Sequence, residues 1–448
     1  MARAMKASGV KWIETIPQTW AIVNLRQVFS FGKGLPITKE DLTESGIPVI
    51  SYGQIHSKIN NGITIRSELI RFVDDGYVNS NPESLVYYND FIFADTSEDL
   101  EGCGNSVFVD VKTKLFAGYH TIILRNNNDY YNKYFAFLFQ SDAWRKQIRE
   151  RATGVKVFSI SQKILRFTTI LLPPIAEQYK IADYLDPRCA EIDHTITEIE
   201  KTIEEYKALK QSIITEAVTK GIRGNRPMKD SGNQRWGTVP IDWKMARVKN
   251  YVISFSSGLS AVTEDNSAEE SGKYVLRTSS VSTGFFKPSE VKPVLISAIN
   301  RLICPVESDT LIVSRMNTSQ MVGACAYVEH DVPNTYLPDK LWKIKFSPEI
   351  CTKYFWYSLN STPARAWFSE LSTGSSDTMQ NISTEDFVNN CIPIPPVSEQ
   401  RAIVAFLDDK CSEIGHLIAQ KEELLLELTS YKKSLIYEYV TGKKEVPV

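Results

Sequence analysis

The sequence lacks the features of several protein classes. No run approaches the roughly 18 consecutive apolar residues that a membrane-spanning helix needs, and the opening MARAMKASGVKW has no apolar signal segment. The seven cysteines stand singly with no C-x-x-C, which argues against a disulfide framework and a zinc knuckle and fits a reducing compartment. We therefore expect a cytoplasmic protein with free thiols, neither secreted nor embedded in a membrane.

Common catalytic motifs are also missing. There is no G-x-x-x-x-G-K-[ST] phosphate loop, no H-E-x-x-H, and no Pro-Asp followed by the acid-x-Lys of metal-dependent nucleases. The runs LPPI and IPPV resemble the Asn/Asp-Pro-Pro-aromatic loop of amino-methyltransferases, but Leu172 and Ile394 replace its polar residue and no aromatic residue follows. FGKG at 31–34 is too short for a cofactor loop and predicts a turn. We expect no catalytic residue, cofactor or metal in this chain.

Charge of one sign does not dominate either. The net charge is -2 and the pI is near 6.3, which by itself speaks against nucleic-acid binding. The distribution is uneven, however, because 143–166 hold seven Lys or Arg against one Glu, whereas 177–216 hold ten acidic against five basic residues. An acidic segment can therefore mask a basic surface elsewhere.

What the sequence does contain is a long internal repeat. LPPIAEQYKIADYLD begins at Leu172 and IPPVSEQRAIVAFLD at Ile394, and 173–219 match 395–441 at 20 of 47 positions. MKASGVKWIETIPQTW at 5–20 likewise mirrors MKDSGNQRWGTVPIDW at 228–243. An offset of 222 residues indicates a duplicated domain rather than a solenoid, and 448 residues with 43% hydrophobic content can fill two or three cores.

The repeated tails predict two long helices. Asp186 and Pro187 fit an N-cap and first turn, and a helix from Pro187 to Thr219 would be about 50 Å long. Apolar residues recur at heptad spacing, so we expect the two tails to pair as an antiparallel coiled coil. The seam residues are Ile192, Ile196, Ile199, Ile203, Tyr206, Ile213 and Ala217, and then Ile414, Ile418, Leu425, Leu428, Leu435 and Tyr439, with Lys210, Lys421 and Lys432 interrupting.

Two repeated polar pairs could be functional or structural. Cys189 with His194, and Cys411 with His416, lie five residues apart, which on a helix separates the side chains by about 140°, so we expect packing rather than metal ligation. The Glu-Gln pairs after Pro-Pro fit the first turn of a short helix, where a carboxylate complements the helix dipole, or a contact with a partner protein. The residues of these candidate partner contacts are Glu177, Gln178, Glu399 and Gln400.

The remaining segments predict two α+β bodies with polar loops. Short β-rich runs such as SVFVDV and DTLIVSR alternate with aromatic helix-like stretches. We divide the chain into a first body (1–170), a central helix region (171–221), a second body (222–392) and a C-terminal helix region (393–448). The fold class is α+β, with two pseudo-symmetric bodies separated by two long helices.

Loops in both bodies concentrate amides, hydroxyls, His, Lys and Arg beside strands. Arg pairs with guanine and Asn or Gln with adenine, while Ser, Thr and Lys suit phosphates, so the loops together favour recognition of DNA over ordinary solvated loops. The candidate DNA-binding residues are Ser51, Tyr52, Gln54, His56, Lys58, His120, Lys156 and Ser159 in the first body, and Arg277, Ser279, Ser280, Gln320, Lys340, Ser375, Ser376 and Gln380 in the second.

The motif PP-x-x-EQ-x-x-I-x-x-x-L occurs twice, each time after an α+β body and before a long helix. In this arrangement the chain resembles the specificity subunits of type I restriction-modification systems. The resemblance covers nearly the whole chain. It implies that each body is a target recognition domain for one half of a bipartite DNA sequence and that the helices form a spacer. Loops similar to TSED…G and SR-N-x-S-x-x-VG occur in the family, which implies DNA contact by Thr96, Ser97, Glu98, Arg315, Asn317 and Ser319. The acidic residues of TSEDLEG depart from this pattern, and they either accept from cytosine amino groups or point away from DNA.

The resemblance also implies partners. Double-stranded DNA, two modification (methyltransferase) subunits, and restriction (translocase and nuclease) subunits held through the methyltransferase would assemble around the chain. S-adenosylmethionine, ATP and Mg would then belong to those partner subunits. The alternatives are a tandem adaptor that binds proteins, which the near-neutral charge favours, and a nicking or methylating enzyme, which the motif search disfavours. DNA binding should weaken steeply with added salt, whereas adaptor binding need not.

Overall fold

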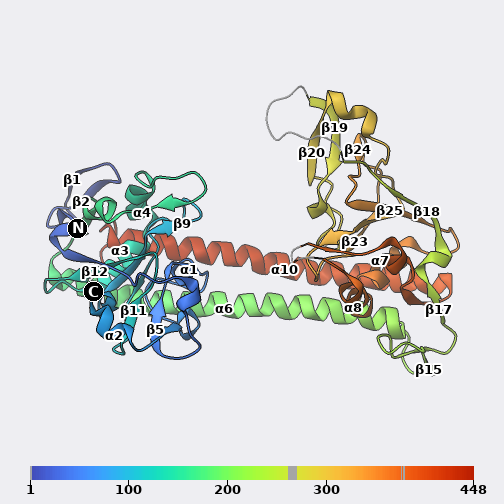
Figure 1. Ribbon diagram of the computed structural model, residues 1–448, viewed down its shortest axis with the longest axis horizontal. Coiled ribbons are helices and arrows are strands. Elements are labelled where there is room, and N and C mark those ends of the chain that lie inside the picture. The colour runs from blue at the N-terminus through green and yellow to red at the C-terminus, as the bar shows by residue number, and fades with distance from the viewer. Residues whose placement is uncertain (1–2, 261–269, 375, 377–378, 448) are drawn as a thin grey trace. The chain divides into compact units, whose positions relative to one another are not determined.

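The computed structural model describes residues 3–260, 270–374, 376 and 379–447 (Figure 1). Contacts divide it into two compact units, Met1–Glu200 with Glu423–Val448, and Lys201–Glu422. The two long helices pass through both units. Each unit therefore contains one body with part of each helix, whereas the sequence-based division gave the helices regions of their own.

The first unit is built from short strands and helices. In chain order these are β1 (Met5–Val10), β2 (Ile13–Pro17), β3 (Ala21–Asn24), β4 (Phe29–Lys33), β5 (Ile47–Ile50), α1 (Tyr52–Ile55), β6 (Arg71–Val73), α2 (Tyr77–Ser80), β7 (Leu85–Val86), β8 (Phe91–Ala94), β9 (Thr96–Ser97), β10 (Ser106–Phe108), β11 (Leu115–Ala117), β12 (Thr121–Asn126), α3 (Asn132–Gln140), α4 (Asp142–Arg149), β13 (Phe158–Ser159), α5 (Gln162–Arg166), β14 (Thr169–Leu172) and the start of α6 (Ile175–Lys220).

Two four-stranded sheets form the first body. One has the order β10-β8-β12-β4 and the other β6-β5-β11-β7, in which β5 and β11 run parallel. Strand β8 is buried along its whole length, and its residues alternate between clusters. Phe91 and Phe93 join the core beneath α3, while Ile92 and Ala94 join the core shared with β5 and β11. Strand β8 therefore contributes side chains to both cores, and strand β9 begins just after its end.

The second unit repeats this plan. Its elements are β15 (Met228–Asp230), β16 (Thr238–Pro240), β17 (Lys244–Arg247), β18 (Val252–Ser257), β19 (Glu270–Leu276), β20 (Val291–Leu295), β21 (Thr310–Ser314), β22 (Met316–Asn317), β23 (Cys325–Val328), β24 (Thr335–Tyr336), β25 (Leu341–Phe346), α7 (Thr352–Leu359), α8 (Thr362–Leu371), β26 (Gln380–Asn381), α9 (Thr384–Val388), β27 (Cys391–Ile394) and the start of α10 (Val397–Val440).

Strand order in the second body matches that of the first. The sheet β18-β25-β21-β23 corresponds to β4-β12-β8-β10, and β20-β19-β24 corresponds to β6-β5-β11, again with a parallel pair, β19 and β24. Strand β21 also alternates between two cores, because Leu311 and Val313 enter one cluster and Ile312 the other. The predicted α+β class with two duplicated bodies is confirmed.

Both tails are single long helices, but they begin earlier than the sequence suggested. Helix α6 starts at Ile175, and Pro187 lies inside it rather than at its first turn. The short separate helix expected after Pro-Pro is also wrong, since Glu177 and Glu399 stand in the first turns of α6 and α10. Because Pro187 has no N–H, the carbonyl of Asp183, four residues earlier, lacks its helical donor. Both residues are exposed, so water can donate to that carbonyl and the helix continues.

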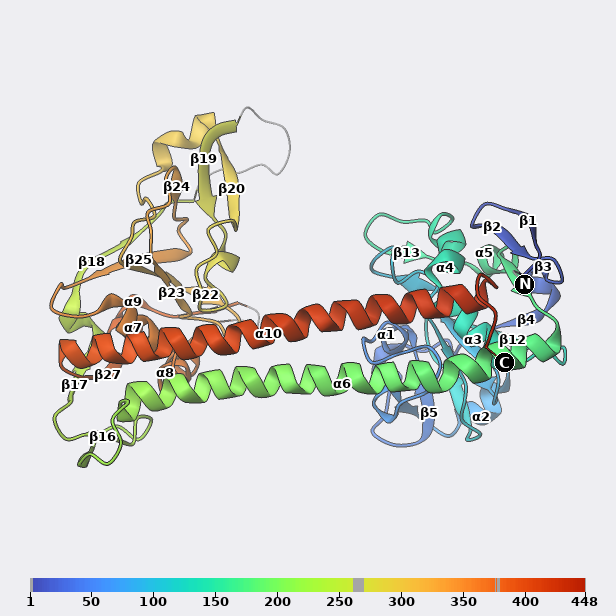
Figure 2. The same cartoon turned by 180° about the vertical axis from the view of Figure 1, so that it is seen from behind.

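The antiparallel pairing of the helices is confirmed within each unit (Figures 1 and 2). In the first unit, the start of α6 packs on the end of α10, and the rings of Tyr184 and Tyr439 lie 4.6 Å apart with their hydroxyls hydrogen-bonded at 3.1 Å. In the second, the end of α6 shares a core with the start of α10, around Ile214 and Leu407.

The polar residues of the tails separate by burial. Lys432, predicted on the seam, forms a half-buried ion pair with Asp193. Cys189 and Cys411 are buried in cores, whereas His194 and His416 are exposed. Among the described helices, none is both long and apolar enough to cross a membrane.

Candidate nucleic-acid interface

Four of the predicted loops of the first body meet at one edge, at the end of β8. The Tyr52 N–H donates to the Tyr119 carbonyl at 3.3 Å, and a ring nitrogen of His56 lies 2.8 Å from the Thr96 carbonyl. Strand β9 pairs with β13, which places Thr96 opposite Ser159. We call this surface the first polar edge, formed by 51–56, 95–98, 119–120 and 158–159.

Aromatic rings cover part of the first polar edge. The ring of Tyr52 lies edge-to-face with those of His56, Tyr119 and His120, at 6.3, 5.6 and 5.4 Å between centroids. His120 has a φ of 55°, a left-handed conformation that non-glycine residues seldom adopt, and its side chain is exposed. Rings with polar atoms at an exposed edge can contact both sugars and bases.

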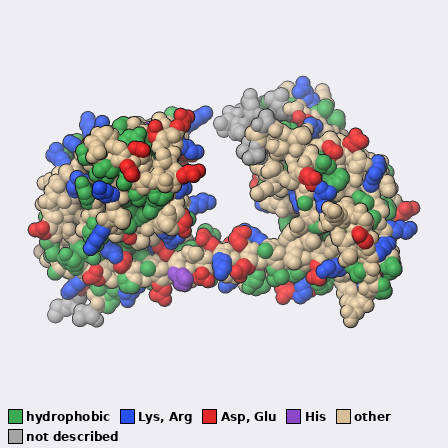
Figure 3. Space-filling model, turned by 60° about the horizontal axis from the view of Figure 1, so that its bottom comes forward, with side chains coloured by type: hydrophobic (Ala, Val, Ile, Leu, Met, Phe, Trp, Pro, Cys, Tyr) green, Lys and Arg blue, Asp and Glu red, His purple; other side chains and the backbone are tan. Residues whose placement is uncertain are grey.

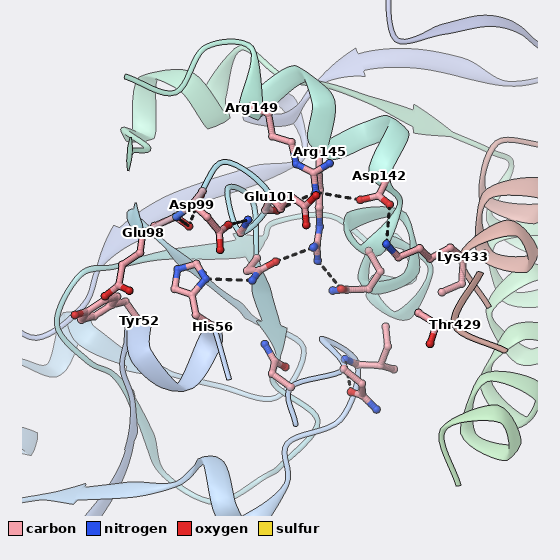
Figure 4. Close-up of a pocket in the computed structure, with 18 of the residues that line it drawn as sticks. Tyr52, His56, Glu98, Asp99, Glu101, Asp142, Arg145, Arg149, Thr429 and Lys433 are labelled. Atoms are coloured by element: carbon pink, nitrogen blue, oxygen red, sulfur yellow. Dashed lines mark hydrogen bonds and ion pairs between the residues drawn. The ribbon is translucent and has the colours of Figure 1, made fainter. Parts of the chain in front are cut away.

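Beside this edge, the loop 97–105 borders a hollow of about 760 Å³ (Figure 4). Arg145 of α4 holds the base of the loop, donating to Asn105 Oδ1 at 2.7 Å and to the Phe139 carbonyl at 2.7 Å. Asn105 in turn donates to His56 Nδ1 at 3.1 Å. Burial lowers the pKa of Arg145 to about 10, so the guanidinium still carries its charge at neutral pH.

The acidic residues of this loop divide into two kinds. Asp99 is used within the loop, because its carboxylate accepts from the Gly102 N–H at 2.6 Å and its carbonyl accepts from Ser97 Oγ at 2.7 Å. Glu98 and Glu101 are exposed. Asp99 is therefore engaged within the loop, and the two predicted alternatives for the acidic run, contact with cytosine amino groups or a direction away from DNA, stay predictions.

The second body has an edge with the same construction. Strand β22 pairs with β26, which places Asn317 opposite Gln380. The Arg315 N–H donates to the Lys340 carbonyl at 3.2 Å, so these two residues are neighbours, and Lys340 is exposed. We call this surface the second polar edge, formed by 315–317, 338–340 and 380–381.

The other predicted DNA-binding residues lie in various settings. Lys58 and Lys156 are exposed in turns near the first polar edge, whereas Ser51, Ser97 and Ser280 are buried. Several make internal hydrogen bonds: Gln54 accepts from the Ser51 N–H, Arg277 Nε donates to the Val291 carbonyl, Ser279 donates to Glu290, and Gln380 donates to the Ser376 carbonyl. Ser319 and Gln320 follow β22, where the Gln320 carbonyl accepts from Arg365, and Ser375 lies outside the described residues.

The four candidate partner residues are largely engaged within their own units. Trp20 Nε1 donates to Glu177 at 2.8 Å, and Arg3 forms an ion pair with the same carboxylate. Gln178 is buried, accepting from the Tyr131 N–H at 3.0 Å and donating to the Pro173 carbonyl at 2.9 Å. These bonds fix the start of α6 to the first body.

The second unit repeats the arrangement. Trp243 Nε1 donates to Glu399 at 3.1 Å, and Arg226 pairs with that carboxylate. Gln400 accepts from the Cys351 N–H at 2.8 Å and donates to the Pro395 carbonyl at 2.9 Å. Sequence reasoning missed the Trp and Arg partners. The repeated IPQTW and VPIDW segments carried the signal for the tryptophans, and the partner contact stays a prediction.

A second hollow in the other unit repeats the first. The hollow of the first unit is lined on its helix side by Thr429, Lys432, Lys433 and Ile436 of α10. A hollow of about 420 Å³ in the second unit is lined by Lys207, Lys210, Gln211 and Ile214 of α6, each 222 residues earlier. Equivalent residues of α10 and α6 therefore face the hollow in the first and in the second unit, respectively. Side chains of both charge signs are interspersed over the visible faces (Figure 3).

Comparison with known proteins agrees with this construction. The family model described as the type I restriction modification DNA specificity domain matches residues 17–205 and 240–426. The chain is 22% identical over 438 residues to the type I restriction enzyme EcoKI specificity subunit of Escherichia coli K12, covering 96% of this chain and 90% of that one. It is 24% identical over 446 residues to the putative MjaX specificity subunit of Methanocaldococcus jannaschii, covering 97% and 96%.

A solved structure from work on complex assembly and conformational transition of the type I R-M system shares the fold. It has a TM-score of 0.64 at 16% identity, covering 96% of this chain and 99% of the other. The family model alone matches most of the chain, once over each body with the first part of the helix that follows it. The chain therefore belongs to the type I restriction modification DNA specificity family, as a specificity subunit whose role is recognition of a DNA target rather than catalysis.

Proposed function

We propose that this chain recognises a bipartite DNA target, one half-site with each body, and directs the methyltransferase and restriction subunits of a type I complex to it. The observation that carries the proposal is the duplication itself. Two bodies with one strand order each present a polar edge at the end of the corresponding strand, β8 or β21. A duplicated recognition domain whose two copies carry different side chains at their polar edges is suited to two different half-sites.

The composition of the edges supports DNA as the ligand. The second polar edge combines Arg315 and Asn317, which can pair with base edges, with the exposed Lys340, which suits a phosphate. The first polar edge has the exposed lysines Lys58 and Lys156 nearby. The low net charge does not oppose this, because α6 and α10 together hold 18 acidic against 11 basic residues, which leaves the rest of the chain with 35 acidic against 40 basic residues.

The repeated starts of the long helices support two equivalent partner sites. Glu177 with Trp20 and Arg3, and Glu399 with Trp243 and Arg226, form the same cluster in each unit. Two matching surfaces on one chain would bind two identical methyltransferase subunits, and the restriction subunits would join through these. S-adenosylmethionine, ATP and Mg would then be held by the partner subunits, in the cytoplasm.

Salt dependence of binding tests this proposal against a protein-binding adaptor. We expect the full chain to bind duplex DNA with an affinity that falls by about 10³ to 10⁵ between 50 and 200 mM salt, if six to ten phosphates are contacted. Lys58→Gln and Lys156→Gln should each reduce the salt slope by about one, whereas Lys249→Gln, exposed on the short 3-10 helix Val248–Tyr251, should leave it unchanged. Binding that ignores salt, or no binding to DNA, would favour the adaptor.

A further inference from the structure

The two polar edges share one backbone position, and the two bodies fill it with opposite charges. In the first body, the Asp95 N–H donates to the His120 carbonyl at 3.0 Å and its carbonyl accepts from the Ile160 N–H at 2.7 Å. In the second, the Arg315 N–H donates to the Lys340 carbonyl at 3.2 Å and its carbonyl accepts from the Ile382 N–H at 3.1 Å. Asp95 and Arg315 are therefore equivalent, as are His120 and Lys340.

The strands around these residues confirm the equivalence. Asp95 and Arg315 each come directly after the last residue of a buried strand, Ala94 of β8 or Ser314 of β21. The N–H of that last residue donates to a carbonyl just before the next strand of the sheet, that of Asn105 before β10 or of Ala324 before β23. Each is followed by a two-residue strand, β9 or β22, paired with β13 or β26. Because the N–H and the carbonyl of this residue are both hydrogen-bonded in each body, the backbone at this position is the same in the two bodies and the difference lies in the side chain.

The side chains present opposite hydrogen-bonding chemistry. Asp95 Oδ1 accepts from Thr96 Oγ1 at 2.7 Å and lies 3.3 Å from His120 Nδ1, so the carboxylate stays on the edge as an acceptor. Arg315 has no acidic partner among the described residues, and its buried Nε finds no hydrogen-bond acceptor there. Unpaired buried donors are uncommon in folded proteins and concentrate at functional sites.

We infer that this shared position is a specificity-determining residue in each body, an inference that rests on the proposed function. Arg315 reads guanine in the half-site of the second body, because a guanidinium fork matches the O6 and N7 acceptors of guanine. Asp95 reads an amino-bearing base, cytosine foremost, in the half-site of the first body, because a carboxylate accepts from the cytosine N4 amino group. Lys340, exposed beside Arg315, is placed to contact phosphate.

Conservative substitutions separate base reading from phosphate contact. Arg315→Lys keeps the charge but loses the planar fork, so it should relax one guanine of the target by about 5- to 140-fold. Arg315→Gln should shift that same position towards adenine, since glutamine pairs with the adenine N6 and N7. Asp95→Asn, in the other body, should relax one position of the other half-site. Arg247→Lys, at the exposed end of strand β17, is the matched control and should change nothing.

The experiment is sequencing of methylated sites in cells that carry the full chain, or a variant, with its methyltransferase, alongside melting of each purified chain. A guanine relaxed by Arg315→Lys and turned towards adenine by Arg315→Gln, with the other half-site intact, supports the inference. An unchanged motif in folded Arg315 variants overturns it while the proposed function stands. Weaker methylation at every site, with no base altered, assigns Arg315 to phosphate and also overturns it. Absence of any bipartite motif for the unsubstituted chain overturns the proposed function itself.

Discussion

Truncation after Gly221 should produce a two-fold dimer whose stability depends on one residue of α6. The truncated chain loses α10, and with it four side chains buried in the core of the first unit: Leu435, Ile436, Tyr439 and Val440. It keeps the residues found 222 positions earlier on α6: Ile213, Ile214, Ala217 and Val218. We expect α6 of a second copy to pack antiparallel on the first, with these residues in the vacated places.

The loss of stability in the dimer follows from the one of these four side-chain replacements in which the sizes differ. Leu435, Ile436 and Val440 are replaced by Ile213, Ile214 and Val218, which are similar in size. Ala217, however, replaces Tyr439, which is 5% exposed and packs on Tyr184. Losing a buried aromatic ring to alanine costs about 3 to 5 kcal/mol, so each body of the dimer lacks about that much stabilisation. Ala217→Tyr should restore it and tighten the dimer by at least about 100-fold per body.

Analytical ultracentrifugation of residues 1–221 over a range of concentrations tests this reasoning. We expect a monomer–dimer equilibrium that Ala217→Tyr shifts strongly towards dimer. Leu209→Tyr, on the exposed side of α6, is the control and should leave the equilibrium unchanged. A monomer at every concentration, or an Ala217→Tyr variant that associates no more tightly, would refute the proposed register of the helices.

Three further outcomes are expected. Inserting about four residues after both Glu200 and Glu422 lengthens each helix by about 6 Å and should widen the gap in the DNA target by one to two base pairs, measured by methylome sequencing; altered half-sites with an unaltered gap would contradict it. Burial raises the pKa of Cys325 to about 12, so at pH 8 a thiol reagent should label the two half-buried cysteines, Cys351 and Cys391, long before Cys325, and prompt labelling of Cys325 would be evidence against its burial. Glu399→Gln should lower the free energy of unfolding in denaturant titration by about 1.5 to 3 kcal/mol, because Arg226 loses one of its two carboxylate partners and keeps Asp242, and a loss below 1 kcal/mol would sink that account.

The sequence predicted the features that depend on local pattern. The heptad positions of the tails are buried or half-buried along both helices, and the duplication reappears as one strand order in both bodies. Pro187 misled the placement of the helix start, because proline inside a helix removes a hydrogen bond and clashes with the carbonyl four residues earlier. Here the exposure of Asp183 to water lowers that cost without abolishing it. Sequence alone does not show that this turn of α6 faces solvent.

The equivalence of Asp95 and Arg315 could not be found in the sequence. The tails align at an offset of 222 residues, whereas these two residues differ by 220, because the loops between the repeated segments differ in length. The backbone hydrogen bonds of these residues and the strand pairings that follow them identify them as one position. Likewise, the roles of Glu177 and Glu399 depend on tryptophans more than 150 residues away, which no local pattern connects.

The central claim, that each body reads one half of a DNA target, is tested most directly by comparing methylomes of cells with and without this chain. The account predicts a set of methylated sites that depends on the chain and shares a motif of two short specified segments separated by unspecified bases. A methylome that does not change when the chain is removed, or a dependent motif that is continuous with no gap, would contradict it.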